Sequence, residues 1–260
     1  MNLNNHPIGI FDSGLGGLTV FKQVIRELPK ENVIYFGDTA RVPYGTKSKD
    51  AIIRFSIENV RDLLKRKVKV IVIACNSSTS YALDVLQKEF DVPIIGVIEP
   101  GVRKAVEATR SGRIGIIATL ATVNSGKYQE HIKQRSSSSK VFSQACPLFV
   151  PLVEEGWLNT PVTRSVAAEY LKPLKAKKID TLILGCTHYP LLKPVLRQVM
   201  GKNVELIDSA REVALEAKRV LQEGGLLRTS TGKAKYDFII SDRPQAFKKL
   251  ARKFLGFEID

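Results

Sequence analysis

Two stretches decide the fold: Val70-Ile71-Val72-Ile73-Ala74-Cys75-Asn76 and Asp180-Thr181-Leu182-Ile183-Leu184-Gly185-Cys186-Thr187. Each is a run of aliphatic residues of strand length that ends in a cysteine and a small polar residue. Runs that stay apolar at nearly every position are typical of parallel strands covered on both faces. The two stretches therefore predict two buried parallel strands, each with a cysteine where the chain leaves the strand.

The rest of the chain alternates between strands and helices. Further strands are predicted at 8–11, 33–36, 93–97, 113–118, 141–145, 204–207 and 236–240. Amphipathic stretches between them predict helices from Gly17 to about Glu27 and over about 48–65, 78–90, 163–174, 191–200, 212–223 and 244–255, with another opening at 122–125 and a polar loop at 136–139. Such alternation indicates a doubly wound α/β architecture.

An internal echo divides the chain into two related halves. The segment 8–13 resembles 114–119, and the segment 70–76 resembles 180–187, in the same order and at similar spacing. Each half then carries one cysteine at the carboxyl end of a strand, which is where open α/β sheets bind ligands.

The composition is that of a globular protein without a membrane span. The chain has 260 residues, of which 44% are hydrophobic and 25% charged. No apolar run approaches the roughly 20 residues that a spanning helix needs, and the first residues lack the pattern of a signal peptide. Three cysteines do not make a disulfide framework, so we expect a reducing, cytoplasmic location.

The formal net charge of +14 is the one unusual bulk feature. A basic surface attracts nucleic acid, anionic lipid or acidic substrates. The lysines and arginines are dispersed over predicted helix faces and turns, and no zinc-finger spacing or aromatic-rich basic strand accompanies them. We therefore expect a diffuse basic surface, with no membrane partner and no specific nucleic-acid partner.

Cys75 and Cys186 are the candidate reactive groups. At a strand-to-helix turn, backbone N–H groups and the helix dipole stabilise a thiolate. Inverting a stereocentre requires a base on one face of a carbon atom and an acid on the other, and one thiol in each half provides both. A buried cysteine is also an ordinary small hydrophobic residue, and that reading is favoured for Cys146, which has no counterpart in the other half.

Polar residues near the two cysteines have both a functional and a structural reading. Asp12 is a candidate for binding a substrate ammonium group or tuning Cys75, and a helix or turn cap is the less favoured alternative. His188 stands two residues after Cys186, where it either orients that thiol or packs as an ordinary histidine. Glu154 and Glu155 are each expected at the surface unless one of them faces the cleft.

Other ligand motifs fail on inspection. Gly14-Leu15-Gly16-Gly17 follows a predicted strand, but Thr19 occupies the place of the third glycine of a dinucleotide fingerprint. Gly126-Lys127 is followed by Tyr128, so there is no phosphate loop of that type. No cysteine–histidine cluster has metal-ligand spacing, and no lysine is singled out for pyridoxal phosphate.

Four motifs together resemble those of bacterial glutamate racemases, within the aspartate/glutamate racemase family. They are Ile10-Phe11-Asp12-Ser13-Gly14-Leu15-Gly16-Gly17, Tyr35-Phe36-Gly37-Asp38-Thr39-Ala40-Arg41-Val42-Pro43-Tyr44-Gly45, Ala74-Cys75-Asn76 and Gly185-Cys186-Thr187-His188-Tyr189-Pro190. The resemblance runs from about residue 8 to the closing stretch at 251–256.

The resemblance implies two pseudo-symmetric α/β domains with the active site between them. The first is expected over 1–98 plus 208–260 and the second over 99–207. It further implies cofactor-independent interconversion of L- and D-glutamate, with D-glutamate supplied for peptidoglycan synthesis. We also expect a homodimer, whose geometry the sequence does not reveal.

The resemblance also implies roles for particular residues. Cys75 and Cys186 are the acid/base pair, and Asp12, Glu154 and His188 assist them. The residues implied to contact the substrate are Asp12, Ser13, Tyr44, Gly45, Asn76, Ser77, Thr187 and His188. One departure is visible at Ser77, where relatives more often have threonine; the hydroxyl is kept.

Two rival functions stay open. One is an aspartate or hydantoin racemase on the same scaffold, against which the four motifs argue. The other is a regulatory protein that interacts with nucleic acid, which the basic charge motivates; some relatives affect DNA gyrase, although no motif of this sequence indicates such a site.

Overall fold

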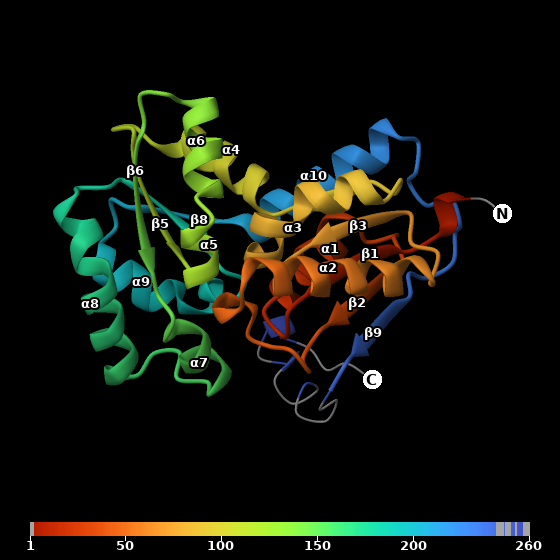
Figure 1. Ribbon diagram of the computed structural model, residues 1–260, viewed down its shortest axis with the longest axis horizontal. Coiled ribbons are helices and arrows are strands. Elements are labelled where there is room, and N and C mark those ends of the chain that lie inside the picture. The colour runs from red at the N-terminus through yellow and green to blue at the C-terminus, as the bar shows by residue number, and fades with distance from the viewer. Residues whose placement is uncertain (1–2, 243–246, 248–250, 253, 257–260) are drawn as a thin grey trace.

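The computed structural model describes residues 3–242, 247, 251–252 and 254–256. Two parallel β-sheets lie side by side in it, each covered by helices on both faces (Figure 1). The first sheet has the strand order β4-β3-β1-β2-β9. Its strands are β1 (Ile8–Asp12), β2 (Val33–Gly37), β3 (Val70–Ile73), β4 (Ile94–Gly96) and β9 (Tyr236–Ile240).

The second sheet has the order β6-β5-β7-β8. Its strands are β5 (Arg113–Ala118), β6 (Lys140–Ala145), β7 (Thr181–Gly185) and β8 (Glu205–Asp208). In both sheets, the strand that the echoed segment forms lies between the next strand in the chain and the strand that leads to the cysteine. In the first sheet β1 lies between β2 and β3, and in the second sheet β5 lies between β6 and β7. The predicted pair of pseudo-symmetric doubly wound sheets is therefore confirmed.

Helices connect successive strands and bury the sheets. They are α1 (Leu18–Glu27), α2 (Lys49–Leu64), α3 (Asn76–Glu89), α4 (Ile98–Ala108), α5 (Leu120–Asn124), α6 (Lys127–Arg135), α7 (Phe149–Glu154), α8 (Pro161–Ala176), α9 (Lys193–Met200) and α10 (Ser209–Glu223). Short 3-10 turns are η1 (Leu3–Asn5), η2 (Tyr44–Thr46) and η3 (Tyr189–Leu192).

The helices differ from the sequence-based expectation in several places. No helix was predicted over α4 or α7, and the helix predicted to open at 122–125 is interrupted at Gly126 and divided into α5 and α6. Helix α3 begins at Asn76, directly after Cys75, two residues earlier than predicted. The predicted helix over 244–255 falls largely outside the described residues.

The strands are apolar throughout because both of their faces are buried. In the first sheet Ile8 and Ile10 face helices α1 and α10, whereas Phe11 faces α2 and α3. In the second sheet Ile114 and Ile116 face α4 and α6, and Ile117 faces the side of α8 and α9. Burying one such side chain contributes about 1.5–3 kcal/mol relative to leaving it exposed.

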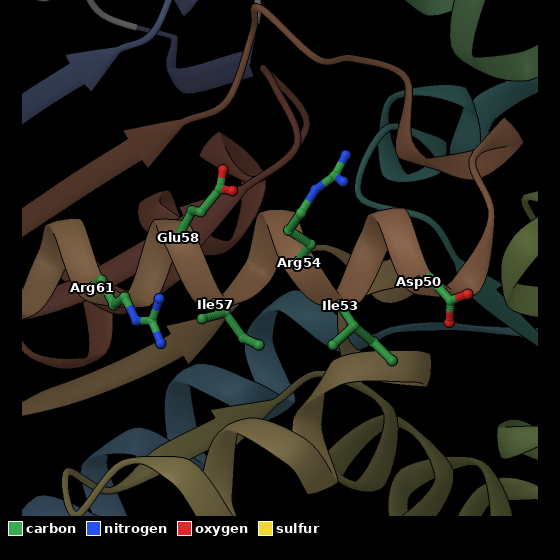
Figure 2. A pocket seen from close by; sticks show the side chains of 6 residues that line it. All are labelled: Asp50, Ile53, Arg54, Ile57, Glu58 and Arg61. Carbon is green, nitrogen blue, oxygen red and sulfur yellow. The ribbon is translucent and has the colours of Figure 1, made fainter.

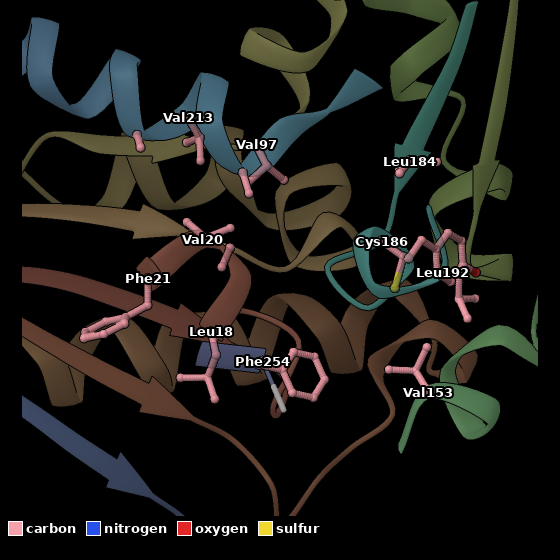
Figure 3. Packing of buried hydrophobic residues seen from close by; sticks show 14 of the residues in the cluster. Leu18, Val20, Phe21, Val97, Val153, Leu184, Cys186, Leu192, Val213 and Phe254 are labelled. Carbon is pink, nitrogen blue, oxygen red and sulfur yellow. The ribbon is translucent and has the colours of Figure 1, made fainter. Parts of the chain in front are cut away.

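One hydrophobic cluster continues from the first half into the second. Figure 3 shows Leu18 and Val20 of α1 in the same cluster as Cys186 and Leu192, which lie beyond β7. All four side chains are buried. The two sheets therefore share packing at the point where the cysteine-bearing turn of the second half meets α1.

A buried ion pair lies at the end of the first sheet where its strands begin. Lys69 Nζ is 2.5 Å from Glu31 Oε2, and both side chains are almost completely buried. Lys69 also donates to the carbonyl oxygen of Leu226, at 2.8 Å, and Glu31 accepts from the backbone N–H of Arg228, at 2.7 Å. The pair thus holds the segment that leads from α10 to β9.

Within the described part of the chain, no helix is long and apolar enough to cross a membrane.

Candidate active site

Both cysteines follow the ends of equivalent strands. Strand pairing sets Phe11 of β1 beside Ile73 of β3, so that Ser13 and Cys75 leave the sheet together. In the second half Ala118 of β5 pairs with Gly185 of β7, which brings Thr119 beside Cys186. Parallel pairing therefore gives each cysteine a hydroxyl-bearing neighbour on the adjacent strand.

One cavity between the two halves contains both cysteines in its wall. Its lining residues are Ser13, Val42, Pro43, Tyr44, Gly45, Cys75, Asn76, Ser77, Thr119, Val150, Cys186, Thr187 and His188. Nine of the residues predicted for the site are in this set: Ser13, Tyr44, Gly45, Cys75, Asn76, Ser77, Cys186, Thr187 and His188. Asp12 and Glu154 are not part of the wall and lie next to residues that are.

Cys75 is a buried free thiol at the amino end of α3. Its Sγ lies 3.8 Å from Ser13 Oγ, to which the thiol donates. Burial, and after it the nearby charge of Asp12, raise the pKa of Cys75 to about 11, against hydrogen bonds with Ser78 and Ser13 that lower it. These neighbours favour the protonated thiol.

Asp12 is fully buried behind the cavity wall. Its carboxylate accepts from the backbone N–H of Gly14, at 3.0 Å, and from Thr187 Oγ1, at 3.5 Å. Burial raises the pKa of Asp12, while the positive charge of His188 opposes the rise. Asp12 thus connects the turn after β1 with the turn after β7, and it also provides the turn cap that was the alternative reading.

Cys186 has a charged neighbour instead. Its Sγ lies 3.8 Å from His188 Nδ1, and His188 Nε2 lies 3.1 Å from Glu154 Oε1. Burial opposes a charge on His188, but the hydrogen bonds to Cys186 and Glu154 outweigh it and raise the pKa of the imidazole to about 10. The side chain of Glu154 is 33% exposed, so it reaches His188 from the surface.

Hydroxyl groups gather at the wall shared by α3 and α5. Ser77 Oγ lies 3.0 Å from Thr119 Oγ1 and 3.3 Å from Thr122 Oγ1. The serine at position 77 therefore keeps a hydroxyl group within hydrogen-bond distance of Thr119 and Thr122 in the second half.

Tyr44 contributes to the wall with its hydroxyl already engaged. That hydroxyl donates to the buried carboxylate of Asp38 and accepts from Asn59 Nδ2 at 3.2 Å. Arg41 Nε donates to the same carboxylate at 2.6 Å. The network fixes the loop that presents Tyr44 and Gly45 to the cavity.

Two glycines permit close approach of the halves. A Cβ at Gly16 would lie 2.2 Å from Thr187 Oγ1, and a Cβ at Gly45 would lie 2.6 Å from Thr119 Cβ. Because any side chain at these positions collides with the opposite half, glycine is required there for the cavity to have its present width.

Sequence reasoning missed four lining residues: Val42, Pro43, Thr119 and Val150. A signal for Thr119 was present, since it ends the segment 114–119 as Ser13 ends the echoed segment 8–13. The other three have no such counterpart.

Two further features lie outside this cavity. Cys146 is buried and donates to the carbonyl oxygen of Gln144, with a sulfur–oxygen distance of 3.7 Å, and burial raises its pKa.

A hollow on the outer face of α2, seen in Figure 2, is lined by Asp50, Ile53, Arg54, Ile57, Glu58 and Arg61. Among the described residues, no group of three or more His, Cys, Asp or Glu side chains is arranged to hold a metal ion.

The family model of Asp/Glu/hydantoin racemases matches residues 8–217. This chain belongs to that racemase family. The match includes both cysteine-bearing turns and every residue of the cavity wall.

Individual racemases extend the similarity over nearly the whole chain. A glutamate racemase of Geobacter metallireducens is 48% identical over 96% of this chain and 92% of its own length. The crystal structure of glutamate racemase isoform RacE1 from Bacillus anthracis has a TM-score of 0.96 at 38% identity, covering 99% of this chain and 96% of that one. The Francisella tularensis glutamate racemase in complex with D-glutamate has a TM-score of 0.93 at 39% identity, with the same coverage.

Proposed function

We propose that this chain is a glutamate racemase that interconverts L- and D-glutamate with Cys75 and Cys186 as its two acid/base groups. Near-full-length similarity to glutamate racemases supports the substrate, as does the D-glutamate bound to the Francisella tularensis relative. The observation that carries the mechanism is that two free thiols, one from each half, share a single cavity.

The proposed reaction transfers one proton at each face of Cα. The thiolate on one side removes the α-proton and becomes a thiol. The thiol on the other side delivers its proton to the opposite face of the carbanion and becomes a thiolate. No net proton is gained or lost, and the reverse direction exchanges the two roles.

The carbanion must be stabilised while it exists. Hydrogen-bond donors aimed at the substrate carboxylate spread the negative charge, and such preorganised donors are worth about 2.7–4 kcal/mol each where one has been removed from other enzymes. Asn76, Ser77 and Thr187 provide donor groups in the cavity wall. We propose that these residues, with Ser13, Tyr44 and Gly45, bind glutamate, and that the reaction requires no cofactor.

His188 and Asp12 prepare the two thiols in this mechanism. A positive charge beside a cysteine favours its thiolate, and His188 carries that charge on the Cys186 side. Glu154 holds the imidazolium in place. Asp12 acts from behind the wall, through Thr187 and through its charge near Cys75.

The wider role proposed is the supply of D-glutamate for peptidoglycan synthesis in the cytoplasm. We further propose a homodimer and a division into 1–98 plus 208–260 and 99–207. The pairing of β9 with β2 supports that division, because it returns the end of the chain to the first sheet. Light scattering of the purified protein tests the dimer.

Circular dichroism of purified protein incubated with L- or D-glutamate, without added cofactor, tests the function. We expect the signal of either enantiomer to decay to zero. Aspartate and hydantoins serve as competing substrates in the same assay. Faster racemisation of one of them than of glutamate would refute the assigned substrate.

A further inference from the structure

A buried hydrogen bond joins the two halves beside Cys75. Tyr128 Oη, on α6, donates to Asn76 Oδ1, on α3, at a distance of 2.7 Å. Tyr128 is 1% exposed and Asn76 is 4% exposed. The bond therefore links the helix that follows Cys75 to a helix that covers the second sheet.

This bond determines which end of the Asn76 amide faces the cavity. A primary amide has an oxygen that accepts and a nitrogen that donates two hydrogens. Tyr128 occupies the oxygen, and Asn76 Nδ2 makes no hydrogen bond with any of the described residues. Since Asn76 is part of the cavity wall, its NH2 group is the part left to meet a ligand.

Tyr128 remains a donor over the whole working pH range. Burial raises the pKa of its phenol above the ordinary value, so the hydroxyl keeps its proton. A phenylalanine in its place would keep the ring packing among Ile114, Ile132 and Ile183 and remove the hydroxyl that donates to Asn76.

We propose that Tyr128 is a positioning residue, which holds the Asn76 amide with its NH2 toward the cavity so that it binds a carboxylate of the substrate. The inference rests on the proposed function, since it assumes an amino-acid substrate. In the opposite orientation the amide oxygen would face the carboxylate, and two acceptors repel one another. A residue of the second half, Tyr128, thus fixes the orientation of a hydrogen-bond donor of the first half, the Asn76 NH2 group.

The test combines Tyr128→Phe, Asn76→Ala and the double variant in the racemisation assay. We expect Tyr128→Phe to raise KM for glutamate roughly 3- to 10-fold, the range of one net hydrogen bond, with a smaller change in kcat. In the Asn76→Ala background, Tyr128→Phe should raise KM no further, because the amide it orients is gone. Calorimetric binding of D-glutamate to the same four proteins should weaken in parallel.

Tyr189→Phe is the matched control. Tyr189 is also a buried tyrosine, and it donates to the carbonyl oxygen of Cys146 at 2.9 Å without lining the cavity. We expect it to lose a similar amount of thermal stability with KM within about twofold of the original, since its lost bond is of the same kind.

The outcomes separate the two proposals. Three results would overturn the positioning role: additive effects of Tyr128→Phe and Asn76→Ala on KM, an unchanged KM in Tyr128→Phe, or an equal rise in KM in Tyr189→Phe. In each of these cases, racemisation of glutamate by the original chain would still support the proposed function. An original chain that neither racemises nor binds glutamate would overturn both.

Discussion

The surroundings of Cys75 and Cys186 differ although their positions in the fold match. Each sulfur follows the strand beside the central strand of its sheet. Cys75 has a neutral hydroxyl, Ser13, as its partner and a buried carboxylate nearby, whereas Cys186 has an imidazole that carries a positive charge. Repetition of the fold fixes where the thiols stand, and their individual neighbours give each one a different electrostatic environment.

Unequal protonation suits a reaction that needs one acid and one base at the same time. Two thiols in identical surroundings would both be protonated or both be ionised over most of the pH range. The two-base mechanism proposed above therefore predicts that the contrast between Ser13 with Asp12 on one side and His188 with Glu154 on the other matters for catalysis. Variants at the two cysteines and at their neighbours test whether that contrast matters.

Replacing either sulfur should have the largest effect. We expect Cys75→Ser and Cys186→Ser each to lower kcat for racemisation by at least about 10³-fold, within the range that positioned acid/base groups contribute. Circular dichroism with both enantiomers measures the loss, and unfolding curves verify that the variants fold.

Cys146→Ser is the control for these two variants, because Cys146 is buried outside the cavity. It should keep most of the activity. A folded but inactive Cys146→Ser protein, or an active Cys75→Ser protein, would show that the reactive thiols were assigned wrongly.

Removing the charged neighbour should have the next largest effect. His188→Asn leaves Cys186 without a cation, so we expect kcat to fall about 10²-fold, the lower end of what such catalysis contributes. The loss should be larger for the enantiomer whose α-proton goes to Cys186. Separate initial rates from L- and D-glutamate, followed by exchange of the α-hydrogen in D2O, measure this difference. Equal exchange rates for the two enantiomers would contradict an unequal pair.

The pH dependence of stability should distinguish the two sides. The pKa of His188 rises from 6.5 to about 10 on folding, so its protonation stabilises the fold below pH 6.5 and this contribution is lost as the pH rises to about 10. The pKa of Cys75 rises from 9.0 to about 11, so its contribution is lost between those values. Each group changes the free energy of unfolding by at most about 1.4 kcal/mol per pH unit.

Urea unfolding of three proteins at several pH values checks this expectation. His188→Asn should lack the decline that begins above pH 6.5, and Cys75→Ser should lack the decline between about pH 9 and pH 11. If the curves of both variants stay parallel to that of the original chain, neither group has the shifted pKa.

Removing the neutral neighbour should have the smallest effect. Ser13→Ala deletes the acceptor of the Cys75 thiol, a weak sulfur hydrogen bond, and we expect a decrease in kcat of about threefold, the size of a small net hydrogen bond. A decrease as large as that of His188→Asn would show that the two sides depend equally on their partners.

The sheets and the cysteine positions were predictable because they depend on short-range pattern. Strands buried on both faces leave continuous apolar runs, and the echo between segments 8–13 and 114–119 revealed the repeated topology. The cysteines stood out because each ended such a run. The resemblance to a family then supplied the other site residues, which periodicity alone did not identify.

The remainder depended on contacts between distant segments. The bond from Glu154 to His188 spans 34 positions and that from Tyr128 to Asn76 spans 52, so no local pattern contains either. The same holds for Val150, an ordinary apolar residue until folding brings α7 to the cavity.

The return of β9 to the first sheet sets the order in which a ribosome can complete this protein. Strand β2 ends at Gly37, and its partner β9 begins at Tyr236. At 5–20 residues per second, roughly 10–40 s of translation separate the two. During that interval the outer edge of β2 has no strand beside it, and an uncovered edge is where chains associate wrongly. The second sheet is made entirely within this interval, so the half that starts first is finished last, when Lys69 and Glu31 receive the segment that precedes β9.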